Sequence, residues 1–387
     1  SSPYKLLAAG EIHLHWAFSS MRFGEYFSAA GGINKAFKLL EKNMKKYPDF
    51  TPTYKSMGLL HTLVGTVPDN YTWATKLMGV DGTIEQGVYE MELVLDRSED
   101  ENLKKETLFL LTFLHINLLN DAESLMRYSS LVNERSGPLM DFAKASLLKE
   151  QGNSDQAISV LESNPSSLNS FPYLHFLLGE LKLARMDQGA DQHFNQFLNS
   201  FKGTSYKKAA AQKIAWYSLL VDLDESAYKK QLNQIGSQPT SILDEDKAAQ
   251  KEFESEKTPN TTLLRARLQF DAGYYKEALK TLIKSDTKDM NSPDENLEFT
   301  YRLARIHDAL ENTDDAISYY HLTIESGAKS KRYFAANSSL MLGLLYERIG
   351  QKEKALKYFK ACSGFNNSEY RNSINQKAKA GILRLNS

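Results

Sequence analysis

The chain has 387 residues, of which 42% are hydrophobic and 25% are charged, which is the composition of a folded globular protein but a length beyond that of one compact core. Lysine and arginine together number 47 and aspartate and glutamate 48, so the formal net charge is −1 and no basic field attracts a nucleic-acid backbone. We therefore expect several domains or an extended array of repeats, and no nucleic-acid partner.

No segment has the pattern of a leader or of a membrane span. The most apolar run, LFLLTFLHINLL at 108–119, is shorter than the ~20 residues that cross a bilayer, so we predict a buried helix there. The chain begins SSPYKLLAAG without a basic segment before an apolar core, so no signal peptide is visible. The localisation stays open between the cytoplasm and, if the chain is processed, the cell envelope.

A pattern of two amphipathic helices joined by a short turn recurs along the chain. In its clearest copy, at 340–362, Gly343 and Ala355 lack the bulk that would hold two helices apart. Tyr346 and Phe359 fill the interface between those helices. In chain order, the alanines at the equivalent second-helix position are Ala36, Ala157, Ala278, Ala316 and Ala355. This spacing resembles the tetratricopeptide consensus, which has a period of about 34 residues.

The last three of these alanines are 38 and 39 residues apart, so the extra residues belong in the loops between repeats. The sequence therefore predicts an all-α fold, a tetratricopeptide-like solenoid of helical hairpins with a pitch of about 38–40 residues and roughly 17–20 helices. We expect three segments along the chain. They are degenerate repeats at 1–234 with a Gly/Pro-rich insert at 58–95, a linker with an exposed helix at 235–259, and regular repeats at 260–387.

The insert departs from the plain repeat through its punctuating residues. These are Gly58, Gly65, Pro68, Gly79, Gly82 and Gly87. Their arrangement resembles a signature of the tetratricopeptide-repeat-thirty-nine and inclusion-body-clearance family, and the upstream EIHLHWAFSSMRFGEYFSAAGGINKAFKLLEKNMKKYP is similar to bacterial relatives of that family. The resemblance implies a non-enzymatic helical scaffold with no catalytic residues. Eukaryotic members have mitochondrial outer-membrane or lipid-related roles.

The residues themselves leave two interpretations of the insert. The glycines and Pro68 interrupt a helix, so 71–78 is expected to form a short helix held against the body by Tyr71, Trp73 and Leu77. One interpretation is a purely structural insert. The alternative is a pocket for a small ligand or lipid, lined by Tyr71, Trp73 and Leu77.

No motif of the chain carries recognisable catalytic or metal-binding chemistry. The sequence contains no nucleophile elbow, zinc-protease helix or paired-cysteine motif. His13 and His15 are two residues apart, so on a helix they point in different directions and cannot share a metal. The single cysteine, Cys362, takes a small buried position, and His61 and His307 take an interface position of the first helix. We therefore expect no enzyme activity, no metal and no cofactor.

The first helices of stacked pairs line the concave face of such a solenoid, and their positions two, five, nine, twelve and thirteen point into it. In the last three repeats this geometry selects Arg267, Phe270, Tyr301, Arg305, Asp308, Glu347 and Arg348. Aromatic rings beside arginines are typical of binding hot spots. The sequence therefore predicts a protein–protein interaction scaffold that binds a peptide or helix of an unidentified protein partner.

Overall fold

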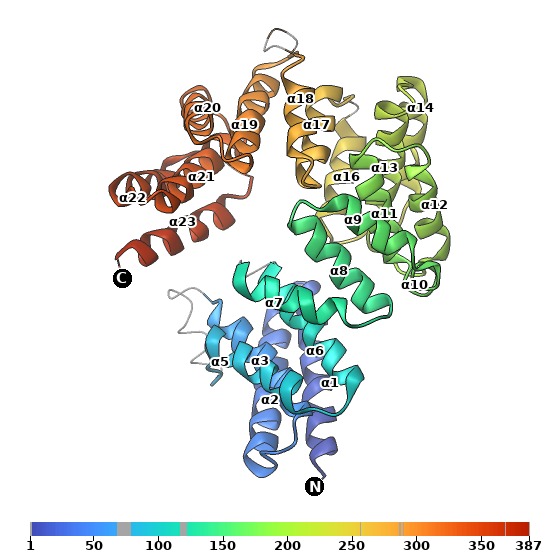
Figure 1. Cartoon of the computed structure of the whole chain (residues 1–387), viewed down its shortest axis with the longest axis vertical. Helices are drawn as coiled ribbons and strands as arrows, with labels where there is room; N and C mark the ends of the chain where they lie inside the picture. The colour runs from blue at the N-terminus through green and yellow to red at the C-terminus, as the bar shows by residue number, and fades with distance from the viewer. Residues whose placement is uncertain are drawn as a thin grey trace. The chain divides into compact units, whose positions relative to one another are not determined.

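The protein is described here from a computed structural model (Figure 1), which covers residues 2–67, 79–116, 122–255, 257–285, 288, 290–367 and 369–386. All regular structure in these residues is helical, which confirms the predicted all-α fold. The helices slightly outnumber the predicted 17–20, because short pieces such as α10 (Pro165–Ser170) and α15 (Gln234–Ser237) are included. None of the helices in the described ranges is both long and apolar enough to cross a membrane.

The chain divides into two compact units. The first comprises Ser1–His175, Phe201–Tyr206 and Thr240–Lys247, and the second comprises Phe176–Ser200, Lys207–Pro239 and Ala248–Ser387. The predicted segments 1–234, 235–259 and 260–387 follow the repeat pattern instead, and they stay a prediction about that pattern.

Helices of the first unit run from α1 to α10, coloured blue to green in Figure 1. Their bounds are α1 Pro3–Arg22, α2 Tyr26–Lys46, α3 Pro52–Gly65, α5 Ile84–Arg97, α6 Glu101–Leu114, α7 Ala122–Asn133, α8 Pro138–Glu150, α9 Ser154–Glu162 and α10 Pro165–Ser170. Consecutive helices pack as hairpins, namely α1 with α2, α3 with α5, α6 with α7 and α8 with α9.

The second unit continues from α11, which begins at the boundary. Its helices are α11 Tyr173–Ala184, α12 Ala190–Ser200, α13 Lys207–Leu220, α14 Glu225–Leu232, α15 Gln234–Ser237, α16 Asp244–Ser255, α17 Thr261–Asp271, α18 Tyr275–Leu282, α19 Pro293–Ala309, α20 Thr313–Ser326, α21 Phe334–Arg348, α22 Lys352–Ala361 and α23 Arg371–Asn386. The hairpins here are α11/α12, α13/α14, α17/α18, α19/α20 and α21/α22.

Small residues allow the two helices of a hairpin to approach each other. A Cβ added at Gly343 of α21 would lie 2.6 Å from the Phe359 ring of α22. Ala304, Ala316 and Ala355 are fully buried in the same hydrophobic core. The spacing of small residues in the sequence therefore marks real helix contacts.

The turn of most hairpins contains one residue in the left-handed conformation. These residues are Gly24, Gly152, Met186, Gly273, Glu311 and Gly350, with φ between 60° and 77°. In each case the next residue donates its N–H to the carbonyl five positions back, as Gln351 does to Tyr346 at 2.8 Å, which is the hydrogen bond of a Schellman motif. Left-handed backbone costs a non-glycine residue about 1–2 kcal/mol, so Met186 and Glu311 occupy strained positions.

Replacing Gly350 by alanine should lower the free energy of unfolding by about 1 kcal/mol. A Cβ at this position would meet no atom within 4 Å, so the whole effect comes from the backbone. Glu311→Ala is the matched control, because that turn already carries a Cβ, and it should change the stability by less than about 0.5 kcal/mol. Urea denaturation followed by circular dichroism measures both variants. Equal losses would contradict this origin of the cost.

Candidate functional site

The seven predicted partner-binding residues lie on three successive first helices of the second unit. Arg267 and Phe270 belong to α17, Tyr301, Arg305 and Asp308 to α19, and Glu347 and Arg348 to α21. The structure brings them together into one continuous line of side-chain contacts. We call this set, with Trp216 of α13 and Arg384 of α23, the arginine stripe.

At one end of the stripe, arginines stack on aromatic rings. The guanidinium carbon of Arg267 lies 4.9 Å from the ring centre of Trp216. That of Arg305 lies 5.0 Å from the ring centre of Phe270, and Arg305 Nη1 donates to Tyr301 Oη at 3.0 Å. Such stacking is favourable when the arginine is partly removed from water. Burial alone would lower the pKa of Arg305, but Tyr301 and Asp308 stabilise its charge, so its pKa lies above the usual value.

At the other end, arginines pair with carboxylates. Arg348 Nη2 donates to Asp308 Oδ1 at 2.6 Å, and Arg384 donates to both oxygens of Glu347, at 3.0 and 2.8 Å. The second oxygen of Asp308 accepts a hydrogen bond from Tyr320 Oη at 2.9 Å. Burial and this carboxylate raise the pKa of Tyr320 well above its ordinary value.

One position of the repeat accounts for these contacts. Phe270, Asp308 and Glu347 each lie three residues before a left-handed turn residue. Each receives an arginine from the next first helix along the chain, namely Arg305, Arg348 and Arg384 respectively. The predicted residues therefore link successive repeats to each other. Arg348 and Arg384 still expose 58% and 53% of their side chains, so this end of the stripe also faces solvent.

Arg305→Met should lower the free energy of unfolding by about 2 kcal/mol, since a partly buried charge loses both a ring contact and a hydrogen bond. Arg348→Met is the control on the exposed side of the same stripe, and it should cost less than about 1 kcal/mol. The shift of the urea midpoint reports both values. A larger effect at Arg348 than at Arg305 would contradict the assignment.

The glycines of the 58–95 insert serve close packing of α3 on α5. A Cβ at Gly58 would lie 2.6 Å from the carbonyl oxygen of Gly87, and one at Gly87 would lie 2.2 Å from Thr62 Oγ1. Beside this contact, His61 Nδ1 lies 2.7 Å from Glu90 Oε2, and both side chains are buried. This confirms the prediction of a core histidine at position 61. The proposed pocket residues Tyr71, Trp73 and Leu77 lie outside the described residues.

The first unit carries a row of aromatic rings that the sequence did not reveal. We call it the aromatic row, and it consists of Phe109 and Phe113 of α6, Phe142 of α8, and Phe171, Tyr173 and Tyr206. Neighbouring ring centres lie 5.0–6.3 Å apart, beginning with Phe109 and Phe113 at 6.3 Å and ending with Tyr173 and Tyr206 at 5.0 Å. These are the separations of favourable edge and tilted ring contacts.

The aromatic row is only partly buried. Phe113 exposes 49% of its surface, although the apolar run at 108–119 predicted a buried helix. The other five rings have intermediate exposure. Because the rings contact one another along one line, together they form a continuous apolar strip at the surface of the first unit.

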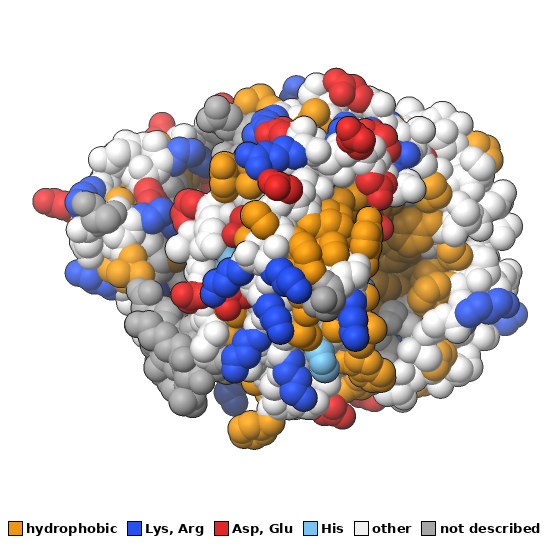
Figure 2. Space-filling view, turned by 90° about the horizontal axis from the view of Figure 1, so that it is seen from below, with side chains coloured by type: hydrophobic (Ala, Val, Ile, Leu, Met, Phe, Trp, Pro, Cys, Tyr) orange, Lys and Arg blue, Asp and Glu red, His pale blue; other side chains and the backbone are white. Residues whose placement is uncertain are grey.

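A second exposed apolar surface lies on the α1/α2 hairpin. Its most exposed large side chains are Tyr4, Ile12, Trp16, Phe23, Tyr26 and Phe27, the last of which is 99% exposed. Figure 2 shows that hydrophobic side chains gather over part of the face it draws, with lysine and arginine side chains beside them. Nothing in the structure shows what covers this hairpin.

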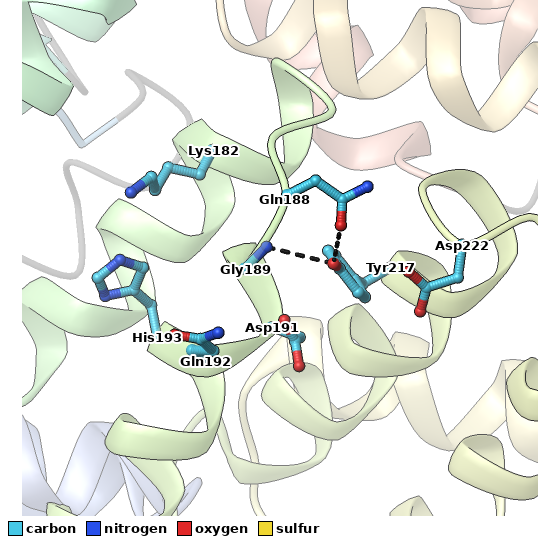
Figure 3. Close-up of a pocket in the computed structure, with 8 residues that line it drawn as sticks. All are labelled: Lys182, Gln188, Gly189, Asp191, Gln192, His193, Tyr217 and Asp222. Carbon is cyan, nitrogen blue, oxygen red and sulfur yellow. Dashed lines mark hydrogen bonds between the residues drawn. The ribbon is translucent and has the colours of Figure 1, made fainter.

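A cavity of about 550 Å³ lies at the turn between α11 and α12. Figure 3 shows its lining, which comprises Lys182, Gln188, Gly189, Asp191, Gln192, His193, Tyr217 and Asp222. Tyr217 Oη accepts a hydrogen bond from Gly189 N–H at 3.2 Å and donates to Gln188 Oε1 at 3.0 Å. Burial and the neighbouring Asp222 raise the pKa of Asp191. The hydroxyl of Tyr217 thus holds the turn in place, and the cavity is polar and open.

The described residues contain no group of three histidine, cysteine, aspartate or glutamate side chains placed to hold a metal ion. Cys362 is buried in the core between α21 and α22, and burial raises the pKa of its thiol to about 11. A thiol in this state is a poor nucleophile at neutral pH.

We therefore expect Cys362 to resist a chromogenic thiol reagent at about pH 8 in the folded protein. Labelling should become complete once guanidinium chloride exposes the thiol, because its pKa then returns toward the ordinary value of 9.0. Absorbance of the released chromophore gives both rates. Rapid labelling of the folded chain would contradict the burial.

The comparisons with known proteins bear on the C-terminal hairpin. Residues 336–368, which contain α21 and α22, match a family model described as tetratricopeptide repeat. The tetratricopeptide-like repeat is thus confirmed there, and the narrower family resemblance stays a prediction. No curated protein matches the chain.

Three solved structures are similar to the chain. One is the apo form of the quorum sensor NprR from B. thuringiensis, at 15% identity and a TM-score of 0.36, covering 85% of this chain and 98% of the other. Another is yeast Tom70, at 11% identity and a TM-score of 0.29, covering 97% and 96%. The third is the P58(IPK) TPR domain, at 14% identity and a TM-score of 0.26, covering 97% and 98%. At these TM-scores no functional argument follows.

Proposed function

We propose that this protein is a non-enzymatic scaffold that binds a peptide or helix of a protein partner on the first helices of its repeats. The observation that carries the proposal is the aromatic row of the first unit. Stacked helical hairpins form extended surfaces, and exposed aromatic strips on such surfaces are typical of protein–protein contacts.

The aromatic row suits a partner better than solvent. Its rings are packed against one another, so their side chains are already ordered and lose little conformational freedom on binding. Phe113 is the most exposed of them and lies at one end of the row. A partner that covers Phe113 would remove apolar surface from water at no cost in unpaired polar groups.

The arginine stripe is the second part of the proposed face, as the sequence predicted. Its solvent-facing members are Arg348 and Arg384, each paired with one carboxylate. Exposed pairs of this kind contribute little stability, so an acidic group of a partner can compete for them. Arg267 and Arg305 are engaged with rings inside the unit, and we assign them to the stacking of repeats.

The small-ligand or lipid alternative near the 58–95 insert lacks a supporting observation in the described residues. The insert's glycines are accounted for by the contact of α3 with α5. The polar cavity at α11–α12 lies elsewhere in the chain.

Phe113→Ala combined with Phe142→Ala should lower partner recovery at least tenfold, because truncating hot-spot aromatics costs about 1–2 kcal/mol or more each. The measurement is quantitative mass spectrometry of proteins that co-purify with the tagged full chain from its native cell. Phe27→Ala is the matched control, since it removes a ring that is 99% exposed but lies outside the row. Circular dichroism verifies that all variants fold. The same partners at equal abundance in the double variant would overturn the proposal.

A further inference from the structure

Helix α16 lies against α13 and α14 and is held there mainly by hydrogen bonds. Its Glu252 carboxylate accepts from three side chains: Gln212 Nε2 at 2.7 Å, Trp216 Nε1 at 2.8 Å and Tyr228 Oη at 3.0 Å. Two residues earlier, Gln250 Oε1 accepts from Lys208 Nζ. Every protein group that α13 and α14 present in these contacts is a donor, so this surface is built for acceptors on a helix.

Little apolar surface holds α16 in place. Among its residues only Ala249 and Asp246 are fully buried, and Phe253 packs over the backbone of Gly236 while remaining partly exposed. Residues 238–243 before the helix and 257–260 after it have no helical structure. A helix of this length is marginal in water without tertiary contacts, so α16 depends on the contacts made by Glu252 and Gln250.

The charges of the two helices are complementary. Residues 244–255 of α16 contain five acidic and two basic side chains, whereas 207–220 of α13 contain three lysines and no acidic residue. Lys251 of α16 also lies 3.6 Å from Glu369, just before α23. Contacts that rest on charge weaken as salt rises.

By contrast, α13 is buried along its whole length, including Lys208, Gln212 and Lys213. Its stability comes from many neighbours, since α14 and α15 pack on it and Lys213 pairs with Glu180 of α11 at 3.2 Å. The surface under α16 therefore has support that does not depend on α16.

We propose that α16 is an internal ligand, which occupies a docking site for an acidic helix of a partner protein. The partner's helix displaces α16 and places a carboxylate where Glu252 now sits, among Gln212, Trp216 and Tyr228. This site extends the proposed scaffold function, on which it rests, to a second surface, distinct from the aromatic row.

The test uses a fluorescent synthetic peptide of residues 240–259 as the acidic helix and the full-length chain as the receptor. Glu252→Ala loosens α16 but leaves the donors of α13 and α14 intact. Fluorescence anisotropy should then show at least tenfold tighter peptide binding to Glu252→Ala than to the unmodified chain. The same peptide carrying Glu252→Ala should bind neither protein.

Glu254→Ala is the matched control. It removes a carboxylate from the same helix, but Glu254 accepts only from Gln250 of α16 itself, at 2.7 Å. This variant should bind the peptide as weakly as the unmodified chain does. Equal affinity of all three proteins for the peptide would overturn the proposal.

Hydrogen exchange of the unmodified chain gives a test that needs no variant. Raising sodium chloride from about 50 mM to about 500 mM should speed exchange in 244–255 severalfold, because screening weakens charge-based contacts, and leave α20 unchanged. Exchange in α16 as slow as in α20 at both salt concentrations would overturn the internal ligand. The proposed scaffold function is tested separately, because its assay depends on Phe113 and Phe142.

Discussion

The close approach of the two helices within each hairpin is the contact on which the rest of the structure depends. It requires a small residue where the helices touch, as at Gly343 beneath the Phe359 ring, and a left-handed residue in the turn, as at Gly350. Once both are in place, the first helices of successive pairs come side by side. Each then presents the same position to the next repeat, which is why Phe270, Asp308 and Glu347 all receive an arginine.

This dependence explains which repeats the sequence revealed. Alanine and glycine at fixed spacing marked the hairpins around Ala157, Ala278, Ala316 and Ala355, all of which are fully buried. The α11/α12 hairpin went undetected because its turn uses Met186 in place of glycine, at φ 64°. A left-handed methionine has no signature in sequence, because the surrounding contacts impose the strain.

The same limit applies to the candidate site. Repeat geometry placed the arginine stripe on the right helices, since the positions follow from helical periodicity. It did not reveal that Arg305 stacks on Phe270, because the contact joins residues 35 positions apart whose distance depends on how tightly two repeats pack. The aromatic row was harder still. Phe171 and Tyr206 lie outside the regular repeats, so no periodicity points to them.

The two faces of the molecule differ in what they leave for a partner. In the arginine stripe most charges are satisfied within the chain, and a competitor must replace those contacts before it gains anything. In the aromatic row the ring contacts persist when a partner covers the exposed edges, so nothing has to be broken first. An apolar segment is therefore the better occupant of the first unit. Helix α16 shows the opposite chemistry in the second unit, where buried donors await a carboxylate and binding proceeds by exchange of one acceptor for another.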